Sequence, residues 1–461
     1  MKWLPISMRR TGQCVAIAFV LHCAAFVART QSLPLPPLPS SAPYSPTETK
    51  EPLRVEQYPD QPSQTPAFTI PLGPLGFSKP GAFYLLRRQS LVSLDFLDEN
   101  RILFTFHVQQ LMHREDSGDS ETKERQIRAV VVALPDGKIE SQAQWSVPDR
   151  FRYLWMLKDG HFLLRDADGI EQGDSALKTA PYLRLPGRLL WLAMDPTQKV
   201  LVTNSLETLD LPQSLGVSAA PAASQVAATP AQPFPDQSKP DAVQILVVRT
   251  LERESGHQIQ ITRVPWTNQS TDWPITSEGY LNSAKGSGRE WLLTLQTFAG
   301  GSKVVGHVDS SCAPTADYLS ANELLVSTCD PGGGRIVAMS ATGDRLWEKR
   351  RFSNVMWPLV VTSQDGSRLA QERLILKRTT NHYKHPIGES ELVGQMVTVF
   401  DAANGKATLE APLTPMLDGG GNMAISPSGR RVAILNAGSI QVFELEAPSR
   451  LLTLPSVPPT H

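Results

Sequence analysis

Two polar segments of the chain gather side chains that could bind a ligand. Residues 113–125 are acidic on balance, and residues 377–386 are basic with one aromatic ring. In the repeat architecture predicted below, only one repeat separates the two segments in the ring, so they could meet and form a contact site for an acidic glycan, a peptide or a protein. The alternative is a pair of solvated loops. The candidate binding residues are His113, Arg114, Glu115, Asp116, Lys377, Arg378, His382, Tyr383, Lys384 and His385.

The same segments contain only weak metal-binding patterns. His382 and His385 are spaced as His-x-x-His, but no cysteine or carboxylate run accompanies them. The acids of residues 115–121 could offer oxygen ligands to calcium, but their spacing is not that of an EF-hand. The sequence also lacks the nucleophile-elbow, zincin and phosphate-loop motifs. We therefore expect no metal site, no cofactor and no catalytic residues.

The four cysteines divide into two pairs. Cys14 and Cys23 fall in the apolar N-terminal stretch, whereas Cys312 and Cys329 belong to the main part of the chain. An even pair in an exported protein predicts a disulfide between Cys312 and Cys329. Two buried free thiols are the alternative.

A repeated hairpin pattern indicates the scaffold that must position these residues. An apolar stretch runs into a tight turn rich in Asp, Asn and Gly and then into a second apolar stretch, which is typical of β-hairpins. The pattern recurs at residues 94–104, 155–164, 192–202, 281–293, 318–326, 361–370 and 424–434. Seven similar hairpins predict a repeat architecture.

A second family of hairpins completes each repeat. Examples are residues 130–147, 245–264, 292–308, 336–347 and 397–406. Polar insertions at residues 107–125, 204–241 and 377–391 explain the three long gaps, and without them the period is about 40 residues, as in a four-stranded propeller blade. The predicted fold is all-β, a seven-bladed β-propeller of four-stranded antiparallel blades. Its fourth blade has an irregular first turn.

The positions of the insertions predict which face of the propeller binds a partner. With strands A to D numbered outwards from the axis, the B–C and D–A connections lie on one face, and the A–B and C–D turns lie on the other. All three insertions fall between a B and a C strand, and the proposed disulfide lies on the same face. Long loops on a rigid scaffold commonly carry binding, so this face is the predicted interaction surface.

Two segments could supply the last strand that closes the ring. Residues 68–72 precede the first blade, and residues 451–454 follow the last C strand. Open sheet edges invite aggregation, so closure is expected. We slightly favour the N-terminal segment, although the C-terminal one requires less chain travel.

The N-terminal segment predicts export, and the net charge bears on the kind of partner. Residues 1–30 combine Lys2, Arg9 and Arg10 with a short apolar run, which is typical of a signal peptide. A lipidated Cys23 or an uncleaved anchor are alternatives. Residues 31–66 are a Pro-rich, disordered spacer, and residues 67–461 form the propeller. The net charge is −1, and it becomes −5 without the four basic residues of the signal, which argues against nucleic-acid binding.

Three segments resemble known propeller repeats. Residues 338–347, with a Gly turn before Trp347, resemble the pyrroloquinoline-quinone (PQQ)-type repeat. Residues 399–406 resemble the YVTN and WD40-like superfamily, and residues 426–433 are similar to a turn common in bacterial WD40-like repeats. The resemblance implies a bacterial seven-bladed propeller, in a superfamily that hosts enzymes, assembly factors and scaffolds.

The leading prediction is an exported, non-catalytic binding scaffold, secreted or periplasmic, with no integral membrane span after signal cleavage. Its partner would be an unidentified protein, peptide or glycan. One alternative is a quinone- or metal-dependent enzyme with its site in the central channel. Another is an envelope protein assembly factor.

Overall fold

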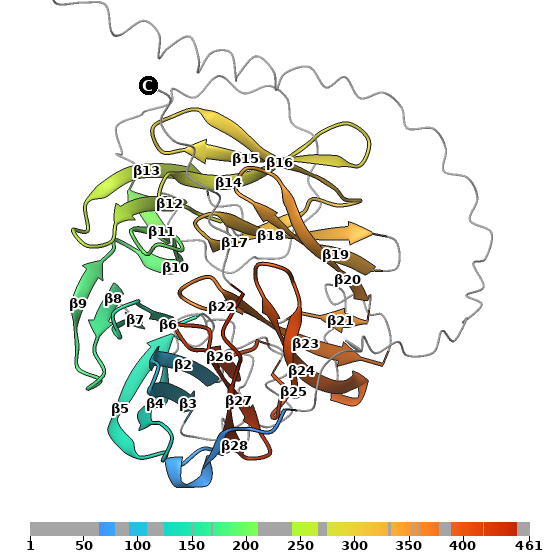
Figure 1. The fold of residues 1–461 in the computed structure, drawn as a ribbon. Coiled ribbons are helices and arrows are strands. Elements are labelled where there is room, and N and C mark those ends of the chain that lie inside the picture. The colour runs from blue at the N-terminus through green and yellow to red at the C-terminus, as the bar shows by residue number, and fades with distance from the viewer. Residues whose placement is uncertain are drawn as a thin grey trace, which may run out of the picture. The chain divides into compact units, whose positions relative to one another are not determined.

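The computed structural model describes a ring of seven β-sheets (Figure 1). The described residues are 64–78, 92–107, 124–148, 152–166, 169–210, 242–265, 274–330, 333–352, 354–357, 359–377, 389–417 and 419–449. Within these ranges the regular structure consists of strands and two 3-10 helices, η1 (Gly73–Leu75) and η4 (Glu389–Glu391). The predicted fold, an all-β propeller of seven antiparallel blades, is confirmed.

Each blade is a meander of consecutive strands. Blade 1 contains β2 (Val92–Asp98), β3 (Arg101–His107), β4 (Glu124–Ala133) and β5 (Ile139–Pro148). Blade 2 contains β6 (Leu154–Met156), β7 (Phe162–Asp166), β8 (Gly169–Gly173) and β9 (Thr179–Arg184). Blade 3 contains β10 (Arg188–Met194), β11 (Val200–Asp210), β12 (Ala242–Glu252) and β13 (Gln258–Pro265). Blade 4 contains β14 (Gly279–Lys285), β15 (Glu290–Thr297) and β16 (Ser302–Asp309).

The remaining blades follow the same order. Blade 5 contains β17 (Thr315–Ser320), β18 (Glu323–Asp330), β19 (Gly333–Ser340) and β20 (Arg345–Phe352). Blade 6 contains an inner strand in two pieces, β21 (Val355–Met356) and β22 (Val360–Thr362), then β23 (Arg368–Leu376), β24 (Leu392–Asp401) and β25 (Ala407–Pro412). Blade 7 contains β26 (Met423–Ile425), β27 (Arg431–Asn436), β28 (Ser439–Glu444) and β1 (Phe68–Pro71).

The burial of each strand follows its place in the blade. All nine residues of β23 are buried, because a second strand has a neighbouring blade on each of its faces. The outermost strand β16 is exposed at five of its eight positions. A strand buried on both faces is usually a continuous apolar run. Strand β23 departs from this rule, because it also buries Arg368, Gln371, Glu372 and Arg373.

A buried apolar cluster fills every junction between neighbouring blades. The cluster between blades 7 and 1 is the largest, with 18 buried residues that include Phe104 and Ile440. The cluster between blades 3 and 4 is the smallest of these, with Val200, Val202 and Ile275 as its three buried members. The junctions thus differ greatly in how much apolar surface they bury.

The N-terminal segment closes the ring. Strand β1 pairs antiparallel with β28, from Phe68 opposite Val442 to Pro71 opposite Ser439. The backbone N–H of Leu72 extends the contact to the carbonyl of Gly438 at 3.0 Å. The slight preference for residues 68–72 is therefore confirmed. The competing segment, residues 451–454, lies outside the described residues.

One hairpin assignment in blade 4 is wrong. In the five other blades for which this bond is found, the residue after the third strand donates its N–H to the carbonyl of the residue before the second strand. These pairs are Leu134 to Asn100, Arg253 to Lys199, Ala341 to Asn322, Ala402 to Ser367 and Leu445 to Arg430. In blade 4 the equivalent bond joins Phe298 to Glu278 at 2.9 Å.

That bond identifies β14, β15 and β16 as the second, third and fourth strands of blade 4. Residues 281–293, predicted as an A–B hairpin, form the B–C hairpin instead. Among the described residues, the inner strand of this blade is reduced to a bridge between Ile275 and Tyr280. The prediction that every blade has four strands therefore fails at blade 4.

Candidate binding face

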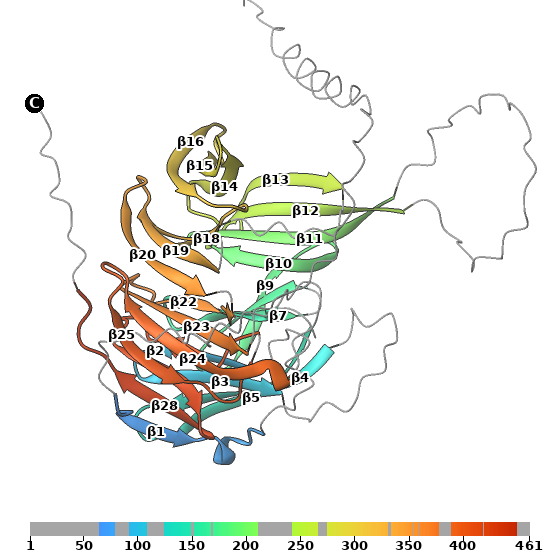
Figure 2. The ribbon, with the colours of Figure 1, turned by 90° about the vertical axis from the view of Figure 1, so that its right-hand side faces the viewer.

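The two faces of the ring carry different kinds of connection. On one face the A–B and C–D turns are tight, and glycines with positive φ occupy the left-handed positions that other residues avoid, as at Gly366 (φ 73°) and Gly405 (φ 68°). The opposite face carries the B–C and D–A connections. In Figure 2 the end of β11, the start of β12 and the start of β4 project towards the same side (right). We call this side the loop face.

The bases of the three insertions rise from paired strands on the loop face. Strands β3 and β4 pair up to His107 opposite Ile127. Strands β11 and β12 pair as far as Asp210 opposite Ala242, so their ladder extends into the segment predicted as an insertion. In blade 6 the N–H of Lys377 donates to the carbonyl of Glu391 at 2.8 Å. Each insertion therefore leaves and rejoins the ring at a hydrogen-bonded pair.

Of the predicted binding residues, only Lys377 is described. Its side chain is exposed, one position beyond the end of β23. The structure therefore does not test whether the acidic and basic segments meet. The other nine lie outside the described residues: His113, Arg114, Glu115, Asp116, Arg378, His382, Tyr383, Lys384 and His385.

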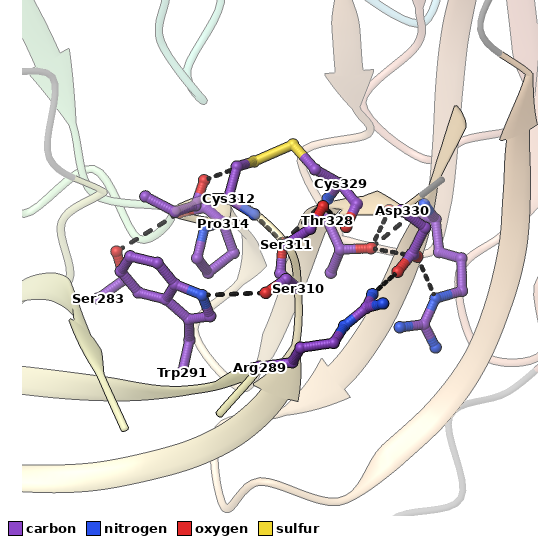
Figure 3. The surroundings of a disulfide bond; sticks show 12 residues. Ser283, Arg289, Trp291, Ser310, Ser311, Cys312, Pro314, Thr328, Cys329 and Asp330 are labelled. Carbon is purple, nitrogen blue, oxygen red and sulfur yellow. Dashed lines mark hydrogen bonds and ion pairs between the residues drawn. A yellow bond between two sulfur atoms is a disulfide. The ribbon is translucent and has the colours of Figure 1, made fainter. Parts of the chain in front are cut away.

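The predicted disulfide joins Cys312 and Cys329, whose Cα atoms are 5.5 Å apart (Figure 3). Cys312 lies in the connection from β16 to β17, and Cys329 lies near the end of β18, so the bond links blades 4 and 5 on the loop face. Two hydrogen bonds support it: the Cys329 N–H donates to Ser310 Oγ at 3.0 Å, and the Ser311 N–H donates to the Cys329 carbonyl at 2.9 Å. The structure contradicts the free-thiol alternative.

An ionic network that the sequence did not reveal surrounds this disulfide. Asp330 pairs with Arg289 from the blade 4 B–C turn and with Arg335 Nε at 2.9 Å (Figure 3 shows the first pair). Arg335 also donates to the carbonyl of Asp309 at 3.0 Å. Burial tends to raise the pKa of Asp330, but the two guanidinium groups outweigh it and hold that pKa below its usual range. The carboxylate therefore stays ionised and joins the two blades.

A second charged group lies beside the central axis. Asp95 belongs to the innermost strand of blade 1, and Arg152 precedes the innermost strand of blade 2. Burial raises the pKa of Asp95, against the opposing effects of a Ser93 hydrogen bond and the charge of Arg152. Arg152 is exposed to solvent, yet burial lowers its pKa. The charge of Asp95 acts in the opposite direction and raises the pKa of Arg152.

The described residues do not form a metal centre. No group of three or more His, Cys, Asp or Glu side chains within them could hold a metal ion. The weak His382–His385 and 115–121 patterns are not among them. No helix in the described part of the chain is long and apolar enough to cross a membrane.

Comparisons with known proteins assign no family. No family model matches the chain. No curated protein matches it either. Among solved structures, the chain is similar to acylaminoacyl peptidase from Pyrococcus horikoshii, at 8% identity over 79% of this chain and 52% of the peptidase, with a TM-score of 0.43. This chain thus spans about half the length of that peptidase.

Two further solved structures are also similar to this chain. A chain of a mitotic checkpoint complex matches at 11% identity over 90% of this chain and 99% of that one, with a TM-score of 0.41. TolB from Acinetobacter baumannii matches at 12% identity over 70% of this chain and 77% of TolB, with a TM-score of 0.31. At these identities and scores, the likenesses assign neither a family nor an activity.

Proposed function

We propose that this chain is an exported, non-catalytic binding protein that uses its loop face to hold a protein, peptide or glycan. The observation that carries the proposal is the asymmetry of the ring. All three insertions leave from B–C positions, so their bases share one face, whereas the other face has short turns. A rigid scaffold with long loops on one side suits recognition, because the scaffold holds the loop bases in place while the loops vary.

Site-specific photocrosslinking in the native host tests the proposal. A photoreactive amino acid replaces Lys377 or Ser390, both exposed at the base of the third insertion. Matched controls replace Asp136 and Ser255, which are exposed in C–D turns of the opposite face. We expect adducts from the first pair that are several-fold more abundant than those from the second. Equal yields from both faces, or adducts only from the control face, would contradict the proposal.

The identity of the adduct separates two versions of this function. An envelope protein caught during its assembly would support the assembly-factor version. A stable glycan or peptide adduct would support a simple binding protein. Export itself is tested by the N-terminus of the purified protein, which should begin near residue 31 if the signal is removed.

The Asp95–Arg152 pair supports a second candidate, an enzyme with its site in the central channel. Groups with perturbed pKa values gather at functional sites, and the pKa values of both members of this pair are shifted by burial. Native mass spectrometry of the protein from its own host distinguishes the two candidates. A small molecule that is retained by the wild type and lost in Arg152→Met would favour the channel. A bare polypeptide mass would favour the loop face.

A further inference from the structure

Glu372 is a carboxyl group buried at the junction of three blades. It lies in the middle of β23 and has 0% of its surface exposed. The inner strand of blade 6 is interrupted beside it: β21 pairs with residues 374–375 and β22 with residues 369–371. The Glu372 backbone N–H donates to the carbonyl of Leu359 within this interruption, at 2.9 Å. The side chain is thus enclosed beneath the connection that leads from blade 6 to blade 7.

That connection, residues 413–422, is built around Glu372 and Gln395. The backbone N–H groups of Gly421 and Asn422 and the side-chain amide of Gln395 donate to the Glu372 carboxyl. Gln395 also binds Leu417 in both directions, accepting from its N–H at 2.7 Å and donating to its carbonyl at 3.0 Å. We call this group of residues the junction cluster.

The same connection holds blade 6 to blades 7 and 1. The Leu94 N–H of blade 1 donates to the Gly421 carbonyl at 3.0 Å. A Cβ at Gly421 would lie 2.1 Å from the Val92 carbonyl oxygen, so only glycine permits this approach. On the blade 7 side, the Thr414 N–H donates to the Leu435 carbonyl at 2.9 Å. As a D–A connection, it belongs to the loop face.

Two buried acceptor atoms of the junction cluster lack a hydrogen-bond partner among the described residues. They are Glu372 Oε1 and Asn422 Oδ1. The orientation of the Asn422 amide is determined by its Nδ2, which donates to the Pro415 carbonyl at 2.9 Å and to Gln395 Oε1 at 3.3 Å. Orphaned acceptors are rare in protein interiors. A proton on Glu372 Oε1 would turn one of these two orphaned acceptors into a donor.

No described positive charge compensates an ionised Glu372. On its own strand, Arg373 pairs with Glu410, and Arg368 pairs with Asp401. Arg152, which precedes the inner strand of blade 2, interacts with Asp95 of blade 1. The elements that touch the carboxyl contribute amides and apolar groups, and Asp418 of the connection lies outside the described residues. Burial therefore raises the pKa of Glu372 to about 8, although the donors from Gly421, Asn422 and Gln395 act to lower it.

We propose that Glu372 is a proton-operated latch: as a neutral acid it closes the 413–422 connection over the blade 6–7–1 junction, and its ionisation releases that connection on the loop face. In the open state the carboxylate reaches water and has an ordinary acidity, so opening is coupled to loss of the proton. The equilibrium constant for opening then rises by roughly tenfold per pH unit between the pKa of Glu372 in the open state and its pKa in the closed state. Above the closed-state pKa it no longer changes with pH. The shape of the loop face would thus respond to pH.

Hydrogen exchange of the purified, exported protein tests the latch. Exchange of residues 413–422 is measured from pH 6 to pH 9 and corrected for the intrinsic rate. We expect protection to fall by about tenfold per pH unit up to pH 8 and then to level off. Residues 245–251 of blade 3 serve as an internal reference and should show no such slope. Equal slopes in the two segments would mean global destabilisation and would overturn the proposal.

Two variants assign the proton. Glu372→Gln keeps the size and stays neutral, so residues 413–422 should remain protected at all pH values. Glu410→Gln changes a carboxyl of the same blade that already pairs with Arg373, and it should leave the wild-type slope in place. A Glu372→Gln protein with an unchanged slope would show that another group titrates and would refute the latch.

Discussion

The two halves of the ring hold their blades together in different ways. Between blades 7 and 1, 18 buried apolar residues meet, whereas the junction of blades 3 and 4 has three. Blade 4 also lacks a full inner strand among the described residues. Its other junction, with blade 5, carries the Cys312–Cys329 disulfide and the Asp330 ionic network.

Both described ends of the chain reinforce the well-packed half. Gln64 Nε2 donates to the Thr408 carbonyl of blade 6 at 2.7 Å, just before β1 completes blade 7. At the other end, the Ser449 N–H donates to Asp401 at 2.8 Å, so the chain returns from blade 7 to blade 6. One half of the ring thus depends on burial and chain closure, and the other uses a covalent bond and exposed charges. The disulfide thus lies at the junction next to the poorly packed one, where nine buried apolar residues also meet.

Removal of β1 should have the largest effect. A protein that starts at residue 64 retains Ile70 and Leu72, both buried, whereas one that starts at residue 73 loses them. Burial of one large apolar side chain contributes about 1.5–3 kcal/mol, so we expect the shorter protein to lose at least about 3–6 kcal/mol of unfolding free energy. Thermal denaturation of the two proteins measures the difference.

The same pair also tests the competing closure. If the protein starting at residue 73 stays fully stable, and loses stability only when residues 450–461 are also removed, then the C-terminal segment can close the ring. That outcome would show that β1 is dispensable, and the well-packed half would owe less to chain closure than the structure indicates.

Arg368→Ala should be the most damaging single substitution in blade 6. The Arg368 and Asp401 side chains are 1% and 5% exposed and lie 3.4 Å apart. Removing one partner of a buried pair leaves an uncompensated charge and typically costs about 3–5 kcal/mol. Arg345→Ala is the control, because it breaks the exposed pair with Glu348. Urea denaturation should show a much larger loss of unfolding free energy for Arg368→Ala than for Arg345→Ala. Similar losses would mean that the buried pair contributes little.

Loss of the disulfide should cost somewhat less. The bond closes a loop with a sequence separation of 17, for which the chain-entropy model predicts about 3 kcal/mol. The Cys312→Ser, Cys329→Ser double variant should therefore melt at a lower temperature, and proteases should cut it first near blade 4. Thiol titration of the denatured, unreduced protein that starts at residue 64, and so lacks Cys14 and Cys23, provides an independent check. Two free thiols in that assay would contradict the disulfide itself.

The sequence predicted what local chemistry determines and missed what distant partners determine. The hairpins were visible because each tight turn needs Gly, Asn or Asp in place. The strand order of blade 4 was not, because residues 281–293 have the same apolar–Gly–apolar pattern whether they join strands A and B or strands B and C. Only the bond from Phe298 to Glu278, which recurs in other blades, distinguishes the two.

The polar residues of β23 show the same limit. Arg368, Gln371 and Glu372 give the strand a partly polar pattern that would suit a surface, yet all are buried. Their burial depends on Asp401, Gln395 and the 413–422 connection, which come much later in the chain. Of the candidate binding residues, Lys377 is the one whose place the structure reports. The junction cluster had no sequence signal, since a lone glutamate in a strand has no motif.

The smallest expected effect is that of Asp330→Asn, and it sharpens the comparison between the two halves. The pKa of Asp330 is lowered in the folded state, so its contribution to stability is present above the unfolded pKa of about 3.9 and disappears as the pH falls through the folded value. Since both Asp330 and Arg289 are partly exposed, the substitution should cost at most about 1 kcal/mol at pH 7 and low salt. The cost should shrink in high salt, and it should also shrink as the pH falls below the unfolded pKa of about 3.9. Measured again in the Cys312→Ser, Cys329→Ser background, it should grow, because the ionic network would then be the main polar link between blades 4 and 5. If the two costs simply add, the network and the disulfide stabilise the junction of blades 4 and 5 independently of each other.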